Sequence, residues 1–326
     1  MSQAIKNKRK ATTILLIALL LGCSFQSDEE NNQDEQESIN INIELSEDGE
    51  CIYDPGNDYG YRYGPSMIIN DDGSIDAWFS RPGNNYDMWD YISYRHMDED
   101  GDWGEEEIVL RPTEGSLDGH SVCDPGVFYY DGYYYLGYTS TINNEGLQNQ
   151  IFVARSTEPN GEYEKWNGSG WGGCPQPIIT YDGTYWGAGE ISFVIEGQEV
   201  LCYYSWKDEG EDSMRSSKAI LSENWPVDIK FRCITSSKEQ YQCSNDVVYL
   251  EDYDVYLAFS IGNRMSSDSY LLVMYSLDGR EFEILDEIAD SFESNAHNLG
   301  ISKHKDGHIT LDDDLYISYA YSANNT

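Results

Sequence analysis

The sequence predicts an all-β fold: a five-bladed β-propeller that follows a lipoprotein signal peptide and a disordered acidic spacer. Helical periodicity is almost absent after residue 50. The 27 tyrosines fall with Trp, Val and Ile in short alternating runs, and Asp-Gly-type turns break these runs at regular intervals. Alternating apolar runs between turn residues are typical of many short strands. We expect one β domain over residues 51–326.

The segment 1–22 is predicted to be a lipoprotein signal peptide. Four basic residues within 6–10 precede an apolar run over 13–21, which ends in Leu-Leu-Gly-Cys at Cys23. A short apolar stretch with basic flanks is typical of a secretory signal. The ending resembles the bacterial lipobox, in which the Cys becomes the acylated first residue. We therefore expect an extracytoplasmic protein held to the bacterial membrane or cell surface by lipid on Cys23. The alternative is an ordinary signal peptide with an incidental Cys.

Residues 23–50 are predicted to be a flexible linker, because residues 24–50 are rich in Asp, Glu, Asn, Gln and Ser and contain no Lys or Arg. The formal net charge of the chain is −39. The electric field of so negative a chain repels nucleic acid and other polyanions. We therefore expect no nucleic-acid partner, and a neutral ligand instead of a sulfated or uronate-rich one. We expect a monomer.

An apolar strand, a turn and a second aromatic strand recur five times after residue 60. The turns lie at Asp72, Asp131, Glu196, Asp252 and Asp306, at nearly even intervals along the chain. Second hairpins lie between the copies. Regular repeats of four strands indicate propeller blades, whose radial arrangement leaves only short sheet edges. A β-sandwich is the alternative, but it does not need five regular copies.

Three carboxylates stand at the start of consecutive copies. Asp124, Glu190 and Asp246 precede their turns by nearly the same interval, whereas the first and fifth copies have uncharged residues there. The first strand of each propeller blade lines the axis, so these carboxyls are expected around one cavity. Like charges in a confined site push pKa values apart, which glycoside hydrolysis uses to divide acid from base or nucleophile. Each residue taken singly could instead cap a turn.

The segment Asp-Pro-Gly-Val-Phe-Tyr-Tyr-Asp-Gly-Tyr-Tyr-Tyr-Leu over 124–136 resembles the Asp-Pro strand and following hairpin of glycoside hydrolase family 43, and more distantly family 32. The resemblance implies Asp124 as base, Glu190 as acid and Asp246 as a helping carboxylate. It also implies substrates such as arabinosides, xylosides or fructosides. The sequence departs from the family in one respect. Family 43 usually presents its base in the first blade and its Glu after the helping Asp, whereas here the first blade lacks the acid at that position and the order is Asp, Glu, Asp.

Five further residues are predicted to bind substrate. Tyr63 and Trp186 could stack on a sugar ring and Arg62 could bond to hydroxyls, although packing is the alternative for each. His120 lies four residues before Asp124. His297 opens the fifth copy, where the resemblance implies a His that helps to hold calcium or water. No cofactor is expected to be required, and an axial calcium ion is the one metal suggested.

Six cysteines follow Cys23, and they allow 15 complete disulfide pairings. Cys233 and Cys243 flank a loop and are the favoured pair. None of the cysteines has the C-x-x-C spacing of a zinc site.

The leading functional prediction is a surface-anchored glycoside hydrolase that acts on a neutral plant- or microbe-derived glycan. A carbohydrate-binding lipoprotein without catalysis on the same scaffold is the first alternative. A structural or adhesive propeller is the second, and it would have no concave axial pocket.

Overall fold

The computed structural model describes the chain at residues 11–21, 41–46, 50–53, 61–85, 88–141, 143, 145–223, 225–235, 245–290 and 292–321. These residues form strands β1 to β22 and one short 3-10 turn, so the prediction of an all-β fold is confirmed. Within them, no helix has the length and apolar character needed to cross a membrane.

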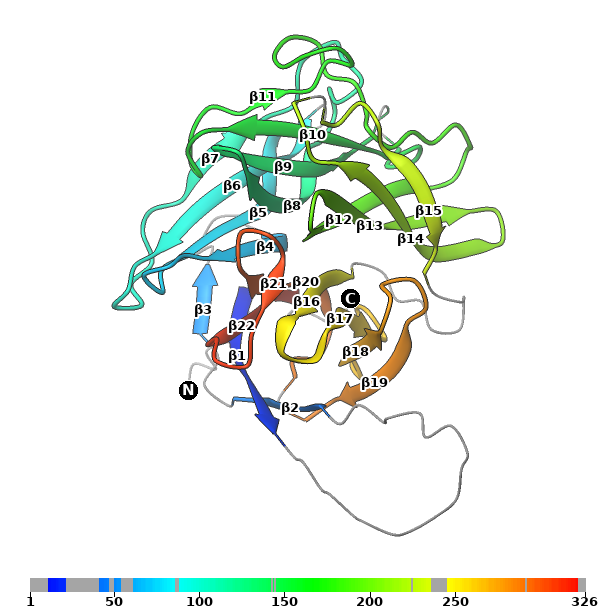
Figure 1. Ribbon diagram of the computed structural model, residues 1–326. Helices are drawn as coiled ribbons and strands as arrows, with labels where there is room; N and C mark the ends of the chain where they lie inside the picture. Colours follow the sequence, from blue (N-terminus) through cyan, green and yellow to red (C-terminus); the bar gives the residue numbers. More distant parts are fainter. Residues whose placement is uncertain are drawn as a thin grey trace, which may run out of the picture.

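The five predicted hairpins are all present, and their first strands lie innermost (Figure 1). These inner strands are β4 (Tyr63–Ile69), β8 (Cys123–Tyr130), β12 (Gly187–Glu196), β16 (Asp246–Leu250) and β20 (Ala296–Lys303). Each pairs antiparallel with the next strand of its repeat, namely β5 (Ile75–Asn85), β9 (Tyr133–Ser140), β13 (Glu199–Asp208), β17 (Val255–Gly262) and β22 (Leu315–Tyr321). Each inner strand contacts the next, and β20 contacts β4, which closes a ring in a propeller arrangement.

Further strands extend most of the hairpins outward. They are β6 (Met88–Met97), β7 (Glu107–Leu110), β10 (Gln150–Ser156), β11 (Glu164–Lys165), β14 (Glu211–Ile220), β15 (Lys230–Ile234), β18 (Tyr270–Ser276) and β19 (Glu283–Ile288). The turn η1 (Glu251–Tyr253) connects β16 to β17, and the short β21 (His308–Ile309) pairs in parallel with β16.

The prediction of five separate blades is wrong, because the strands in the described part of the chain are hydrogen-bonded into four sheets. Three sheets contain β8–β11, β12–β15 and β16–β19 with β21. The fourth has nine strands, since β20 pairs in parallel with β4 through Ser302↔Met67 and Lys303↔Ile68. This short ladder joins the fifth repeat to the first.

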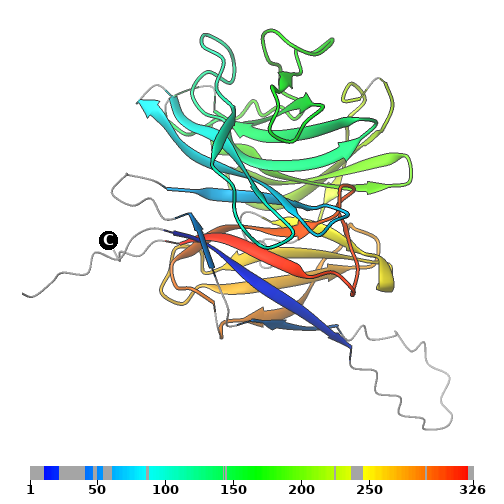
Figure 2. The same ribbon diagram turned by 90° about the vertical axis from the view of Figure 1, so that its left-hand side faces the viewer.

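Residues of the predicted signal peptide and linker also form strands. Ala11–Leu21 is β1, which lies alongside β22 in Figure 2 and also pairs with β2 (Ile41–Leu45) and β3 (Glu50–Tyr53). Part of the segment predicted to be a flexible linker is therefore a strand, because the alternation in Ile-Asn-Ile-Glu-Leu buries Ile41 and Ile43. Cys23 lies outside the described residues, and cleavage and lipidation stay predictions.

The core lies between neighbouring sheets. Trp78 of β5 packs with Leu136 of β9 in one cluster, and Leu201 of β13 packs with Met274 of β18 in another. Phe128 and Phe193, from β8 and β12, lie with their ring centroids 4.8 Å apart. Each buried aromatic or aliphatic side chain contributes roughly 1.5–3 kcal/mol, so these interfaces hold the inner strands in place.

Candidate active site

Among the described residues, a residue in the left-handed backbone region stands near the start of four of the five inner strands. The residues are Gly64 (φ +58°), Asp124 (φ +48°), Glu190 (φ +55°) and Asn298 (φ +47°). The strand pairing shifts register at each of these points. Such a conformation costs a non-glycine residue roughly 1–3 kcal/mol, and strained residues of this kind cluster at active sites. The structure thus gives Asp124 and Glu190 the same position in successive repeats.

Equivalent hydroxyl groups hold the backbone at this position. The Asp124 N–H donates to Ser80 Oγ at 2.8 Å, and the Glu190 N–H donates to Thr139 Oγ1 at 2.8 Å. Ser80 and Thr139 come from β5 and β9, the second strands of the preceding repeats. A hydroxyl group of the preceding repeat therefore stabilises the strained backbone of Asp124 and of Glu190 in the same way.

The Asp124 and Glu190 carboxyl groups share one donor. Asn298 Nδ2 donates to Asp124 Oδ1 at 3.0 Å and to Glu190 Oε1 at 3.3 Å. Two oxygens bound to one nitrogen at these lengths lie at most roughly 6 Å apart. All three residues are buried. Two carboxyl groups are therefore held close together out of water.

Hydrogen bonds and a cation also hold Glu190. Ser205 Oγ donates to Glu190 Oε2 at 2.5 Å, and Arg264 Nη1 lies 3.4 Å from Glu190 Oε1. Arg264 also donates through Nη2 to Asn298 Oδ1. This contact orients the Asn298 amide so that its nitrogen faces the two carboxyl groups.

Two carboxyl groups of the site have pKa values above the ordinary value of an aspartate. Burial, together with the negative charge of Glu190, raises the pKa of Asp124 to about 7. Burial also raises the pKa of Asp90 in β6 to about 6, although Ser121 Oγ donates to its Oδ2 at 3.0 Å. Carboxyls that keep a proton near neutral pH are typical of acid–base sites.

These groups line a cavity of about 230 Å³. Its walls include Trp89 and Trp186, whose rings could stack on a sugar, and the cations Lys207 and Arg264. A much smaller cavity of about 20 Å³ adjoins it, because Asp124 and Glu190 line both.

Asp246 lines only the smaller of these two cavities. Its carboxylate forms a buried ion pair with Lys303, accepts from Ser192 Oγ at 2.7 Å and accepts from the Ile301 N–H at 3.0 Å. Ser192 Oγ accepts from the Val247 N–H of the next inner strand, just as the Asp246 carboxylate accepts from the Ile301 N–H of the inner strand that follows its own. Asp246 therefore stands at the position that Ser192 has in its own strand, two residues further in than Glu190. The expected common register of Asp246 with the other two acids is wrong.

Only two of the five predicted substrate-binding residues line the 230 Å³ cavity, namely Tyr63 and Trp186. Arg62 is buried in an ion pair with Glu106 at 2.8 Å. His120 accepts from the Trp89 N–H through its backbone oxygen at 2.8 Å. His297 is buried, with its ring stacked on Tyr61 at a centroid distance of 5.1 Å.

Sequence reasoning did not assign Asn298, Asp90, Trp89, Lys207 or Arg264 to the site. Asn298 could have been found, since it precedes the Asp306 turn by a spacing close to that of Asp124. Lys207 lies in β13, the second strand of its repeat, and the other three come from β6 or a loop, so none of them occupies the position that Asp124 and Glu190 share in their inner strands.

A larger, open cavity of about 630 Å³ lies at the opposite ends of the strands. Its lining includes Asp76, whose carboxylate contacts His96 Nδ1 at 2.9 Å and Tyr94. None of the predicted catalytic carboxylates lines it. The predicted Cys233–Cys243 bridge involves Cys243, which lies outside the described residues.

No known protein family and no curated protein matches the sequence. Solved structures match its fold. A family 117 glycoside hydrolase of the marine bacterium Zobellia galactanivorans is 16% identical, covers 82% of this chain and 87% of its own, and has a TM-score of 0.55. The catalytic domain of a GH62 α-L-arabinofuranosidase from Coprinopsis cinerea is 12% identical, with coverages of 80% and 90% and a TM-score of 0.54. The β-xylosidase RS223 is 15% identical, with coverages of 83% and 94% and a TM-score of 0.53. At these identities the likeness shows the fold alone.

Proposed function

We propose that this protein is a glycosidase that acts on a neutral glycan, with Asp124 and Glu190 as its catalytic pair. The observation that carries the proposal is the sharing of one Asn298 amide by two buried carboxyl groups at a cavity with indole walls. The fold supports it, because structures with this fold include glycoside hydrolases.

The raised pKa of Asp124 favours this residue as the acid. The resemblance to family 43 implies the opposite roles, with Asp124 as base and Glu190 as acid. A carboxyl with a pKa of about 7 is about half protonated at neutral pH and largely protonated below it, so it can give its proton to the glycosidic oxygen. Glu190, which faces Arg264, then acts as the carboxylate.

The Asp124 and Glu190 oxygens that share the Asn298 nitrogen lie at most roughly 6 Å apart, and this separation favours retention of configuration. Retaining pairs stand about 5–5.5 Å apart and inverting pairs about 6.5–9.5 Å. In the first step, Glu190 attacks the anomeric carbon while Asp124 protonates the departing oxygen, so the glycosidic C–O bond breaks and an alcohol leaves. In the second step, water gives a proton to Asp124 and attacks the anomeric carbon. This step releases the sugar and restores the Glu190 carboxylate.

The size and charge of the cavity favour a small neutral sugar. A volume of about 230 Å³ is below the roughly 300–1,000 Å³ typical of drug-sized ligands, which suits a terminal sugar unit. The strongly acidic chain repels a polyanionic glycan. We further propose that lipid on Cys23 holds the enzyme outside the cytoplasm.

Glycan capture without hydrolysis is the second candidate function. It is favoured by Gly64, which offers no side chain at the first-repeat position equivalent to Asp124, where family 43 presents its base.

A panel of neutral aryl glycosides and oligosaccharides tests the choice. We expect hydrolysis by the wild type and a loss of about 10³-fold in kcat for Glu190→Gln. His96→Ala, in the larger cavity, is the control and should retain activity. Saturable glycan binding without product would support glycan capture. A loss of hydrolysis confined to His96→Ala would indicate that the active site is in the larger cavity.

A further inference from the structure

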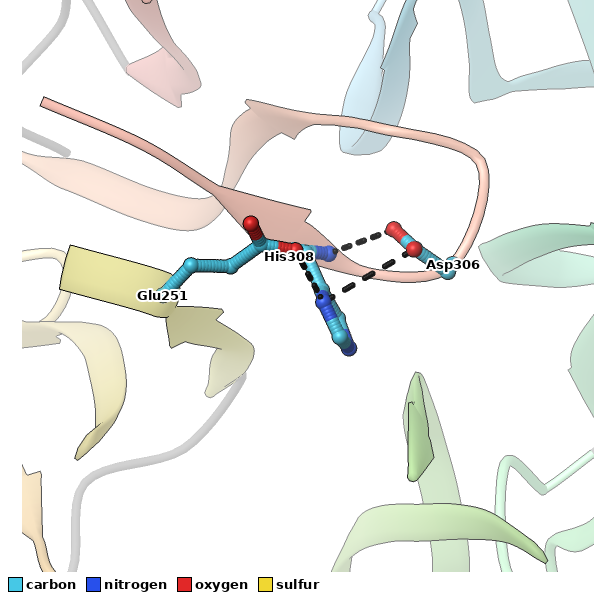
Figure 3. Close-up of side chains that lie close together, drawn as sticks. All are labelled: Glu251, Asp306 and His308. Atoms are coloured by element: carbon cyan, nitrogen blue, oxygen red, sulfur yellow. Dashed lines mark hydrogen bonds and ion pairs between the residues drawn. The ribbon is translucent and has the colours of Figure 1, made fainter. Parts of the chain in front are cut away.

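A second cluster of metal-ligating side chains lies away from the carboxylate pair. Glu251, Asp306 and His308 each offer one ligand atom, and these atoms lie within 4.8 Å of one another. Figure 3 shows Glu251 and Asp306 approaching the His308 ring from opposite sides. Glu251 begins η1 after β16, and the other two residues lie in and after the turn that follows β20. The cluster therefore sits beyond the ends of the inner strands, whereas the carboxylate pair lies near their starts.

The His308 ring is oriented by a backbone carbonyl. Its Nε2 lies 2.7 Å from the Ile195 oxygen, and since a carbonyl only accepts, this nitrogen carries the proton. Nδ1 is then the nitrogen that faces the carboxylates, 2.8 Å from Glu251 Oε1 and 3.7 Å from Asp306 Oδ2. An Nε2–H bonded to a carbonyl is the arrangement that presents the Nδ1 lone pair of a metal-binding histidine.

Backbone contacts fix the turn that carries two of the three ligands. The Ile195 N–H donates to the backbone carbonyl oxygen of Asp306 at 2.7 Å, and the Tyr249 N–H donates to the backbone carbonyl oxygen of Gly307 at 3.1 Å. Asp306 Oδ1 accepts from the His308 N–H at 3.1 Å, which leaves Oδ2 toward the ring. The turn is thus held by groups outside the cluster, on β12 and β16.

We propose that Glu251, Asp306 and His308 bind a divalent transition-metal ion of the Zn²⁺ class. Two carboxylates and one imidazole each offer a ligand atom, and these atoms lie close enough together to meet at one ion. An imidazole donor favours Zn²⁺ or Co²⁺ over Ca²⁺ and Mg²⁺, which prefer oxygen ligands. Three protein ligands leave room for water to complete a tetrahedral shell. The ion joins the β16–β17 connection to the turn after β20, and so links the fourth repeat to the fifth.

Titration of the tag-free, chelator-treated full chain with ZnCl₂ and CoCl₂ tests the site, with calorimetry and Co²⁺ absorption as readouts. His304→Asn is the matched control. His304 lies on the same turn, but its Nε2 meets the Asp313 carboxylate, at 2.9 Å, and not the cluster. We expect the wild type and His304→Asn to bind one ion more per chain than His308→Asn does, and Zn²⁺ to raise their Tm. Glu251→Gln changes an exposed side chain, so it should fold, and it should bind at least tenfold more weakly. Equal stoichiometry and affinity in the wild type, His308→Asn and Glu251→Gln would overturn the proposal.

Discussion

Asp124→Asn tests the electrostatics of the candidate active site through protein stability. The substitution removes a carboxyl that burial and the charge of Glu190 disfavour in its ionised form. Asn tolerates the positive φ of this position, so the backbone need not move. The stability difference between the two proteins should therefore report the titration of Asp124.

The sign and size of the effect follow from the pKa. The carboxyl titrates near 3.8 when unfolded and near about 7 when folded. Because the folded state binds the proton more tightly, the stability of the wild type falls as pH rises from about 4 to about 7 and is level above that. A shift of roughly three units corresponds to about 4 kcal/mol at about 1.36 kcal/mol per unit.

Urea unfolding of both proteins between about pH 5 and pH 8 measures this difference. Relative to the wild type, Asp124→Asn should gain a few kcal/mol in the free energy of unfolding up to about pH 7, and no more beyond it. Asp131→Asn is the matched control, because Asp131 has nearly the same φ of +47° but is exposed in the turn of the same hairpin. The free energy of unfolding of Asp131→Asn should vary with pH in the same way as that of the wild type. A pH-independent difference for Asp124→Asn would refute the reasoning.

Three further predictions concern separate parts of the chain. Lys303→Met leaves Asp246 buried without its cation and should lower the free energy of unfolding by about 3–5 kcal/mol, and adding Asp246→Asn should recover part of this loss in the same urea assay. Gly64→Ala places a Cβ 2.8 Å from Asp124 Oδ1 at a φ of +58°, so kcat should fall and stability should drop by about 1–2 kcal/mol. Unchanged kinetics in that variant would mean that the Asp124 carboxyl does not need its present position. Cys23→Ala should abolish labelling of the protein by radioactive palmitate in the producing cells, and persistent labelling would exclude Cys23 as the lipidated residue.

Much of the fold could be predicted because it depends on local signals. Gly73, Gly132 and Gly307 all have positive φ, at +85°, +84° and +86°, and they mark the hairpin turns that the Asp-Gly pairs predicted. The joining of the fifth repeat to the first could not be predicted, since it depends on only two residue pairs between β20 and β4. No local pattern specifies so short a ladder.

The error at Asp246 has a physical cause in the turn after β16. Asp124 and Glu190 lie six residues before the last paired residues of their strands, Tyr130 and Glu196, whereas Asp246 lies only four before Leu250. The longer connection through η1 moves the reference turn forward along the chain. Counting back from Asp252 therefore reached a residue further along the strand.

Mechanism-based labelling tests the central claim most directly. Wild-type protein would be incubated with 2-deoxy-2-fluoro derivatives of whichever neutral glycosides it hydrolyses, and the modified peptide would be located by mass spectrometry. The account predicts one covalently bound sugar, on Glu190, and no label in Glu190→Gln. A label on another residue, or hydrolysis that inverts the anomeric configuration without any label, would contradict it.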